Sequence, residues 1–369
     1  MDVYFGLVFG LYFIFLIALC IGWLSALQTK PSSSSNTILI SVVVAVRNES
    51  KNIDRLLESL AAQNYPRSNF EIILVDDHSE DDSVSKMEKW LSRINNLKIV
   101  HIPGESHGKK AALSHAIHLA SGEIIATTDA DCILPSNWLT LINQDFAHEK
   151  TNMLIGAVAI NDATSFFNSL QSVEFASVIG TGISLAALGK PTMCNGANLS
   201  FRRKTFFEVK GYLGNENIAS GDDEFLMRKI LEKYPNSIQV LNPSECVVVT
   251  APQNSLNDFI QQRLRWAGKW KVNSSVFSKS LAVVIILVQL SWMLLIAASL
   301  FNSSSFLITI LLSKVLGELV FLRFVSGTLK VKFNLISFLL LQFIYPSYVL
   351  GIGFLSQASG YRWKGRSVT

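Results

Sequence analysis

The sequence predicts an α/β domain with a mostly parallel sheet, joined to membrane-spanning helices. Apolar β-branched segments alternate with amphipathic segments through the middle of the 369-residue chain, a pattern typical of parallel sheets with covered faces. Long uncharged apolar runs flank this middle part. Residues 31–280 hold 24 Lys/Arg and 26 Asp/Glu, whereas residues 281–369 hold seven and one. This separation of charge indicates a membrane-anchored protein rather than a single soluble globule.

Composition also excludes other classes of protein. The chain is 49% hydrophobic without low-complexity repeats, which argues against disorder, collagen and coiled coil. The slightly acidic middle has no basic stripe, so we expect no nucleic-acid partner. The four cysteines have no paired spacing, which suggests neither a zinc site nor a disulfide framework and fits a reducing cytosol.

Uncharged runs at both ends are long enough to cross a bilayer, which takes about 20 apolar residues. Val3–Thr29 is predicted to be a transmembrane helix, because it is too long for a signal peptide and no basic residue precedes it. Two further spans are expected at 281–301 and 305–325, separated by a polar break. The last run, Phe333–Tyr361, contains Pro346, so it either spans the membrane or dips in and returns at that proline.

Basic residues beside the spans predict the topology, because Lys and Arg collect on the cytosolic side. Lys30 and Lys279 border residues 31–280, which places that region in the cytosol. The expected division is an anchor at 1–30, a cytosolic domain at 31–280 and a membrane region with a basic tail at 281–369. This makes the chain a multi-pass integral membrane protein, in the cell or inner membrane if it is bacterial.

Within the third span, Lys314 and Glu318 are four residues apart, so they share a helix face and can pair inside a helix bundle.

The middle region contains a regular alternation of elements. A buried strand is expected at Ile38–Val46, followed by a helix whose apolar residues recur at helical spacing. Further strands are predicted at Glu71–Val75, Leu97–Ile102, Glu123–Thr128 and Met153–Ile160, and helices at Ser50–Gln63, Asp81–Leu91, Lys109–Ala120 and Leu139–Ala147. Because ligands of parallel sheets bind beyond the carboxyl ends of the strands, the residues that follow each strand are the candidates for a site.

Charged residues stand where these strands end. Asp129 and Asp131 follow one strand, and in an extended segment both point to the same side. Mg²⁺ and Mn²⁺ prefer such carboxylate oxygens together with substrate phosphates. A chance loop motif is the alternative for this pair, and helix capping is the alternative for the acids after the second strand. The other residues at strand ends are Arg47, Glu49, Asp76 and Asp77.

Two further segments carry candidate residues. No glycine-rich phosphate loop is present, but Lys109 at a helix start could meet a diphosphate. Asp222 and Asp223 begin another helix, either as acids favoured by the helix dipole or with a catalytic role. Just before the C-terminal membrane region, a group of cations and tryptophans fits either a site or a membrane interface, and the interface interpretation applies most to Trp270 and Lys271. The group consists of Arg263, Arg265, Trp266, Lys269, Trp270 and Lys271.

Taken in order, these motifs resemble the family 2 glycosyltransferases, inverting enzymes with the nucleotide-diphospho-sugar (GT-A) fold. The resemblance covers about Ser41 to Trp266. The motifs that carry it are Arg47-Asn48-Glu49, Val75-Asp76-Asp77-x-Ser79, Gly108-Lys109, Asp129-Ala130-Asp131, Asn195-Gly196-Ala197-Asn198, Asp222-Asp223 and Gln262-Arg263-Leu264-Arg265-Trp266.

The resemblance implies a role for each motif. Asp223 would be the general base, while Asp131 with Asp129 would hold a divalent cation, Mg or Mn. Arg265 would approach the diphosphate and Trp266 would form an acceptor platform. The nucleotide-sugar set would be Arg47, Glu49, Asp76, Asp77, Lys109 and Asp129, and the acceptor and diphosphate set would add Gly196, Asn198 and Gln262.

The expected reaction is transfer of a hexose from a nucleotide-sugar donor, UDP-linked at family level with GDP-mannose as the second choice, to a membrane lipid acceptor. A processive or polysaccharide-assembling enzyme is the alternative, since the Gln-x-x-Arg-Trp motif occurs in both groups. A non-catalytic membrane scaffold is a second alternative, but it predicts lost carboxylates and every expected one is present. The sequence leaves the acceptor, protein partners and oligomeric state open.

Overall fold

The structure is a computed structural model, and its described residues form two compact units. Unit 1 comprises Met1–Leu24, Asp162–Ser184 and Pro252–Thr369, and unit 2 comprises Ser25–Asn161 and Leu185–Ala251. The described residues are 1–29, 36–104, 106–162, 164–214, 220–269, 275–301, 304–358, 361–363 and 366–368. Some positions used in the sequence analysis lie outside the described residues. They include Lys30, which was used to predict the topology, the segment 31–35 and Lys364 of the basic tail.

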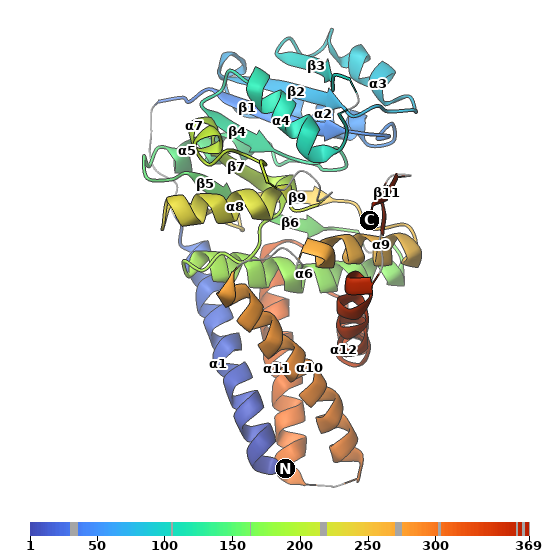
Figure 1. The fold of residues 1–369 in the computed structure, drawn as a ribbon. Coiled ribbons are helices and arrows are strands. Elements are labelled where there is room, and N and C mark those ends of the chain that lie inside the picture. Colours follow the sequence, from blue (N-terminus) through green and yellow to red (C-terminus); the bar gives the residue numbers. More distant parts are fainter. Residues whose placement is uncertain are drawn as a thin grey trace. The chain divides into compact units, whose positions relative to one another are not determined.

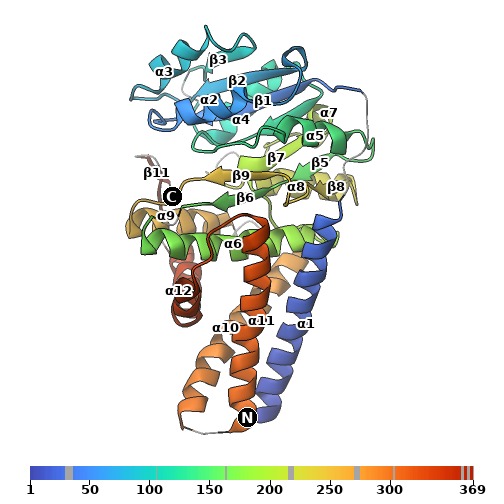
Figure 2. The same ribbon diagram turned by 180° about the vertical axis from the view of Figure 1, so that it is seen from behind.

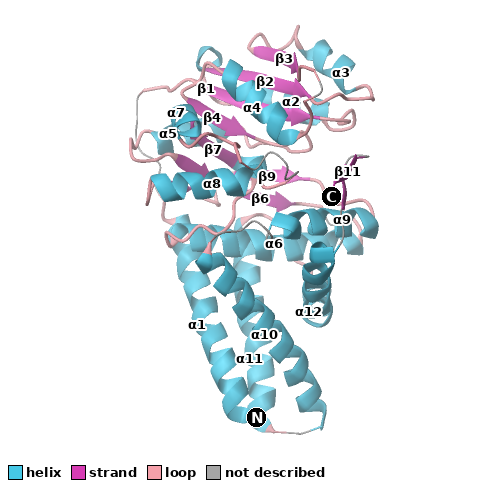
Figure 3. Ribbon diagram, in the orientation of Figure 1, coloured by secondary structure: helices cyan, strands magenta, loops and turns pink. Residues whose placement is uncertain are grey.

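Unit 2 is built on a seven-stranded sheet with the order β3-β2-β1-β4-β7-β5-β8 (Figures 1 and 3). Neighbouring strands are parallel except for β7, which runs antiparallel to β4 and β5. The predicted fold class, an α/β domain with a mostly parallel sheet, is therefore confirmed. The strands are β1 (Ile40–Val46), β2 (Phe70–Asp76), β3 (Leu97–His101), β4 (Ile124–Thr127), β5 (Met153–Ile155), β7 (Leu199–Arg202) and β8 (Ile238–Val240).

Helices cover this sheet because their apolar residues recur on one face. In α2, Ile53, Leu56, Leu57 and Leu60 are all fully buried, as their spacing predicts. A second, two-stranded sheet pairs β6 (Ala157–Ile160) with β9 (Val247–Thr250) in parallel. The helices of unit 2 are α2 (Ile53–Ala61), α3 (Ser83–Trp90), α4 (Lys109–Leu119), α5 (Trp138–Phe146), α7 (Arg203–Glu208) and α8 (Asp222–Lys233), with short 3₁₀ turns η1 (Arg67–Asn69) and η2 (Gly196–Asn198).

The single strand predicted over Met153–Ile160 is wrong, because the chain breaks there into β5 and β6 in different sheets. Gly156 lies at the break. A Cβ atom at this position would stand 2.2 Å from the side chain of Asn198, so only glycine permits the approach. An apolar run without this tertiary contact looks like one continuous strand.

The strand register places the functional loops at one edge of the sheet. Val46 of β1 lies opposite Asp76 of β2, and Val43 of β1 lies opposite Thr127 of β4. The segments after β1, β2 and β4 therefore leave the sheet on the same side, which is where parallel sheets bind ligands.

Among the described residues, five helices are long and apolar enough to cross a membrane, and all five lie wholly or mostly in unit 1. Four of them are α1 (Asp2–Leu27, whose last three residues lie in unit 2), α10 (Val276–Phe301), α11 (Ser305–Thr328) and α12 (Leu335–Ala358). Figure 2 shows α1, α10 and α11 side by side. The turn considered at Pro346 does not form, because α12 continues through this proline as one helix. Unit 1 also contains α9 (Leu256–Gly268) and the hairpin β10 (Tyr361–Trp363) and β11 (Arg366–Val368).

The fifth apolar helix, α6 (Phe166–Ala187), was not anticipated. It is 72% buried over its most apolar window, against 22–28% for the other four. In Figures 1 and 2 it crosses the direction of α1 and α11 within unit 1.

Glycines allow the close contacts of α6 with its neighbours. A Cβ at Gly22 of α1 would lie 2.3 Å from the carbonyl oxygen of Ser184, and one at Gly180 would lie 3.0 Å from Val325 of α11. Small residues at such crossings let helix backbones approach closely.

Aromatic and aliphatic side chains join the far ends of α1, α10 and α11. Trp292 is 1% exposed and its ring meets Phe9 edge-on, with centroids 6.3 Å apart. The cluster consists of Phe5, Phe9, Val288, Trp292, Leu295, Leu307 and Ile310.

Candidate active site

A lysine surrounded by carboxylates forms the centre of the candidate site in unit 2. The ammonium Nζ of Lys109 lies 2.6 Å from Oδ1 of Asp129 and 3.6 Å from Oδ2 of Asp222. Three separate segments supply these groups: the start of α4, the loop after β4 and the start of α8. The Lys109 side chain is 20% exposed and that of Asp222 10%.

The electrostatics of this cluster favour the charged lysine. Burial alone would lower the pKa of Lys109, but the carboxylates of Asp129, Asp222 and Asp223 outweigh burial and raise the pKa well above its usual range. The cluster therefore holds a fixed positive charge beside acidic groups.

Asp223 is fixed by two backbone groups. Its Oδ2 accepts the N–H of Gly196 at 3.0 Å, and its Oδ1 accepts the N–H of Glu224 at 2.7 Å. Helix α8 begins after Gly221, whose φ of +82° suits glycine, and the helix dipole favours acids in its first turn. The half-buried carboxylate is thus oriented by the sheet-side loop and by its own helix.

Gly196 also leaves room at the cluster. A Cβ at this position would lie 3.3 Å from Nζ of Lys109 and 3.4 Å from Oδ2 of Asp222. The carbonyl of Gly196 accepts the hydroxyl of Thr127, at the end of β4, at 2.8 Å. The loop therefore brings its backbone directly against the lysine and the carboxylates.

The residues after β4 fit a divalent cation. Asp129 is 36% exposed and Asp131 is half-buried, so both present hard oxygen donors near solvent. Among the described residues no group of three or more His, Cys, Asp or Glu forms a complete metal cage. A pair of carboxylates that completes its coordination with substrate phosphates is the usual arrangement for Mg²⁺.

Asp76 and Asp77 have different surroundings. Asp76 accepts the N–H of Ser79 at 3.2 Å and lies 3.4 Å from His101 Nδ1. Asp77 is 1% exposed and its Oδ2 accepts the N–H of Gly108 at 3.0 Å, which ties the end of β2 to the start of α4. Asp77 thereby positions Lys109.

Arg47 contacts the loop after β2, whereas the side chain of Glu49 contacts its own segment. Nη1 of Arg47 donates to the backbone carbonyls of Asp77 and His78 at 2.7 and 2.9 Å, and the residue is 7% exposed. Glu49 accepts from the side chain of Asn52 at 2.7 Å. Arg47 therefore shapes the loop after β2.

Asn198 lies in the core behind the cluster. It is fully buried, accepts the indole N–H of Trp138 at 2.9 Å and donates to the carbonyl of Ala157 at 2.9 Å. These bonds hold η2 and hence Gly196 in place.

The Gln-x-x-Arg-Trp segment belongs to unit 1, on α9. Arg263 is 5% exposed and forms a buried ion pair with Glu174 of α6, its Nε lying 3.2 Å from Oε1. Its guanidinium lies 4.3 Å from the ring centre of Trp266 and also contacts Gln262. Arg263 therefore locks α9 to α6 rather than reaching a membrane interface. Arg265 is half-buried, and Trp270 and Lys271 lie outside the described residues.

The structure adds to the sequence analysis at two residues. Asp222, expected to be a helix-start acid or a catalytic residue, faces Lys109. Tyr212 is 7% exposed, and burial first and Asp222 second raise its pKa well above the usual value. No sequence motif marks Tyr212, because only the folding of its loop brings it beside Asp222 and Asp223.

Fold and site together describe an α/β domain with a cluster of one lysine and several carboxylates at the edge of its sheet where parallel strands bind ligands. Residues 41–209 match the family described as Glycosyl transferase family 2. This part of the chain belongs to that family, and the fold is GT-A.

The curated relatives include enzymes with two kinds of acceptor. A beta-monoglucosyldiacylglycerol synthase from Trichormus variabilis is 27% identical over 238 residues, 62% of this chain and 48% of that protein. A poly-beta-1,6-N-acetyl-D-glucosamine synthase from Staphylococcus epidermidis is 26% identical over 233 residues, 62% of this chain and 53% of that protein. The chain thus spans about half the length of these relatives.

A solved structure shares the fold over most of the chain. A mannosyltransferase from Pyrobaculum calidifontis, in complex with GDP-Man and Mn2+, superimposes with a TM-score of 0.61 at 18% identity, covering 96% of this chain and 99% of that one.

Proposed function

We propose that this protein is an inverting glycosyltransferase that moves a hexose from a nucleotide-diphosphate sugar, UDP-linked in our preferred assignment, to a hydroxyl of a membrane lipid. The observation that carries the proposal is the cluster at the edge of the sheet, where Lys109 lies between Asp129 and Asp222 and Asp223 is oriented beside them. This cluster combines a cation for a diphosphate with a carboxylate for an acceptor.

In the proposed reaction Asp223 accepts the proton of the acceptor hydroxyl. The oxygen attacks the anomeric carbon, the new C–O bond forms, and the bond to the diphosphate breaks with its electron pair leaving on the nucleotide. A single carboxylate suffices because inversion needs one base and no covalent intermediate. Positioned base catalysis contributes about 10²–10⁴-fold.

The charge that develops on the leaving diphosphate needs stabilisation. Lys109 and Arg265 are the proposed protein cations for it. A divalent cation, held by Asp131 and Asp129, would supply Lewis-acid stabilisation when bound. The residues proposed at the nucleotide side are Arg47, Glu49, Asp76 and Asp77, and Arg47 also holds the loop after β2. Trp266 and Gln262 are proposed at the acceptor side.

Membrane placement forms part of the proposal. Helices α1, α10, α11 and α12 would span the bilayer and unit 2 would face the cytosol, in accordance with Lys279 and the other basic residues near the spans. This arrangement brings a soluble donor to a lipid-borne acceptor. The relatives whose names specify diacylglycerol support this acceptor class.

Polysaccharide assembly is the second candidate, supported by the relatives named as poly-N-acetylglucosamine synthases. One assay separates the two. The purified full chain in lipid nanodiscs receives labelled UDP-glucose, UDP-N-acetylglucosamine or GDP-mannose with Mg²⁺ or Mn²⁺. We expect label in the chloroform–methanol phase; label in a long ethanol-insoluble polymer would overturn the lipid assignment.

A further inference from the structure

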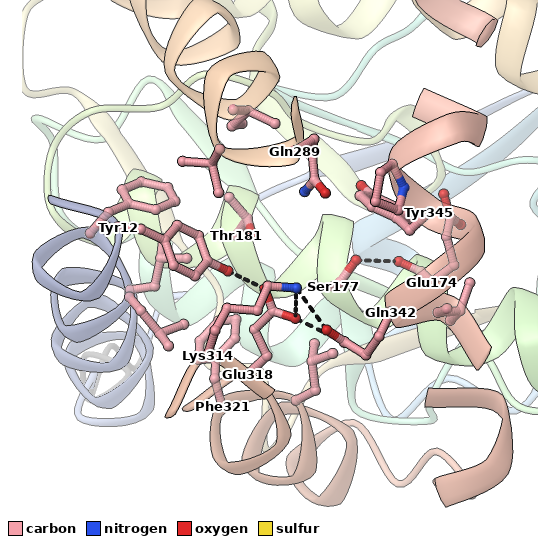
Figure 4. Close-up of a pocket in the computed structure, with 18 of the residues that line it drawn as sticks. Tyr12, Glu174, Ser177, Thr181, Gln289, Lys314, Glu318, Phe321, Gln342 and Tyr345 are labelled. Atoms are coloured by element: carbon pink, nitrogen blue, oxygen red, sulfur yellow. Dashed lines mark hydrogen bonds and ion pairs between the residues drawn. The ribbon is translucent and has the colours of Figure 1, made fainter. Parts of the chain in front are cut away.

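A cavity of about 150 Å³ lies inside unit 1. It is lined by side chains of α1, α6, α10, α11 and α12 (Figure 4). Its wall is mostly aliphatic and aromatic. Val284, one of its lining residues, is 43% exposed on the apolar outer surface of α10. A ligand with hydrocarbon chains can therefore be accommodated by this wall and by the membrane around it.

The charges in the cavity neutralise one another. Nζ of Lys314 lies 3.0 Å from Oε2 of Glu318 and donates to Oε1 of Gln342 at 2.7 Å. The amide of Gln342 donates to Glu318 at 2.9 Å, and the hydroxyl of Tyr12 donates to the same carboxylate. The remaining lining acid, Glu174, is paired with Arg263. Such a neutral wall offers no spare cation to an anionic phosphate, as far as the described lining residues show.

Gln289 of α10 is different from these groups. It is 8% exposed, and its amide makes no hydrogen bond with any residue in the described part of the chain. Figure 4 shows this amide directed into the space between Thr181 and Tyr345. The amide atoms are not fully enclosed and keep contact with the space of the cavity, so a ligand or water there can complete their hydrogen bonds. An amide donates and accepts at once, as a hydroxyl does.

We propose that this cavity binds the neutral lipid acceptor before its hydroxyl reaches Asp223, with Gln289 as the residue that recognises the hydroxyl headgroup. The inference rests on the proposed function, because the ligand would be the acceptor class. Glu174 lines the cavity and also holds Arg263 of α9, the helix that carries Arg265 and Trp266. Occupancy of the cavity is thereby connected to the motif helix within the same unit.

A direct binding measurement tests this assignment. The full chain in detergent micelles is titrated with radiolabelled dioctanoylglycerol, and bound lipid is counted after rapid gel filtration. We expect Gln289→Met to weaken binding about tenfold, since it keeps the size of the side chain and removes its hydrogen bonds. Leu290→Ala, at an exposed neighbouring position on α10, is the control and leaves binding unchanged. Thr181→Val probes the same wall through a second side chain.

Kinetics distinguish this inference from the proposed function. Gln289→Met should raise KM for the lipid and leave KM for the nucleotide sugar unchanged. If the enzyme transfers sugar to lipid but wild type and Gln289→Met bind dioctanoylglycerol equally well, the proposed cavity site is wrong and the proposed function stands. Lipid binding that depends on Gln289 without transfer to any lipid would overturn the function and keep the site. Equal binding of dioctanoyl phosphatidic acid would overturn the preference for a neutral headgroup.

Discussion

Removal of the Lys109 ammonium should destabilise the protein even without substrate. Lys109→Met leaves Asp129 and Asp222 close together without the cation that lies 2.6 and 3.6 Å from them. Breaking a fully buried ion pair costs about 3–5 kcal/mol. Because Asp129 keeps 36% exposure and water screens it, we expect a smaller cost of about 2–3 kcal/mol.

The predicted cost corresponds to a fall in Tm of about 4–12 °C for a unit of this size. It is measured by thermal unfolding of the full chain in micelles, with EDTA at pH 7. Lys98→Met is the matched control, since the Lys98 side chain is 54% exposed in its pair with Glu71 and should cost less than about 1 kcal/mol.

The pH dependence has a definite sign. Since the pKa of Lys109 is raised in the folded state, its contribution is complete below the unfolded lysine value of about 10.4 and is lost only as the pH rises through the folded value. The difference between wild type and Lys109→Met should therefore be constant from pH 6 to 9. Equal Tm values for Lys109→Met and Lys98→Met would refute the ion cluster.

Three further variants test the packing and electrostatics. Gly22→Ala places a Cβ 2.3 Å from a backbone carbonyl of α6 and should cost about 1–3 kcal/mol in thermal unfolding, whereas Gly10→Ala, with open space around it, should not. Arg263→Met leaves a buried carboxylate of α6 unpaired and should cost about 3–5 kcal/mol, seen as a lower Tm; an unchanged Tm would contradict the buried pair. Burial first and Glu245 second raise the pKa of Asp145 to about 7, so the folded protein loses stability as the pH rises from about 4 through 7. Asp145→Asn should therefore raise Tm more at pH 8 than at pH 5, and an equal gain at both pH values would contradict the raised pKa.

The sequence predicts most of the sheet because the signals are local. Each parallel strand is an apolar β-branched run, and each helix has apolar residues at helical spacing, as in α2. The acids at strand ends share one edge because parallel strands share a direction, so Asp129 could be expected near Lys109.

What the sequence does not predict depends on contacts between distant segments. The break at Gly156 is set by Asn198, and the neighbourhood of Tyr212 is set by loop folding. Helix α6 carries too little local signal to show that it packs against α1, α9 and α11. Arg263 looks like an interfacial cation until Glu174, 89 residues earlier in the chain, is placed beside it.

The central claim, that Asp223 is the base of a glycosyl transfer to lipid, is tested most directly by Asp223→Asn. Turnover is followed as labelled hexose in the chloroform–methanol phase, and binding of the nucleotide diphosphate is measured by calorimetry on the same preparation. The substitution keeps the size of the side chain and removes its ability to take a proton. We predict that transfer falls by about 10²–10⁴-fold while nucleotide binding stays within twofold. Turnover close to that of the wild type would contradict the assignment.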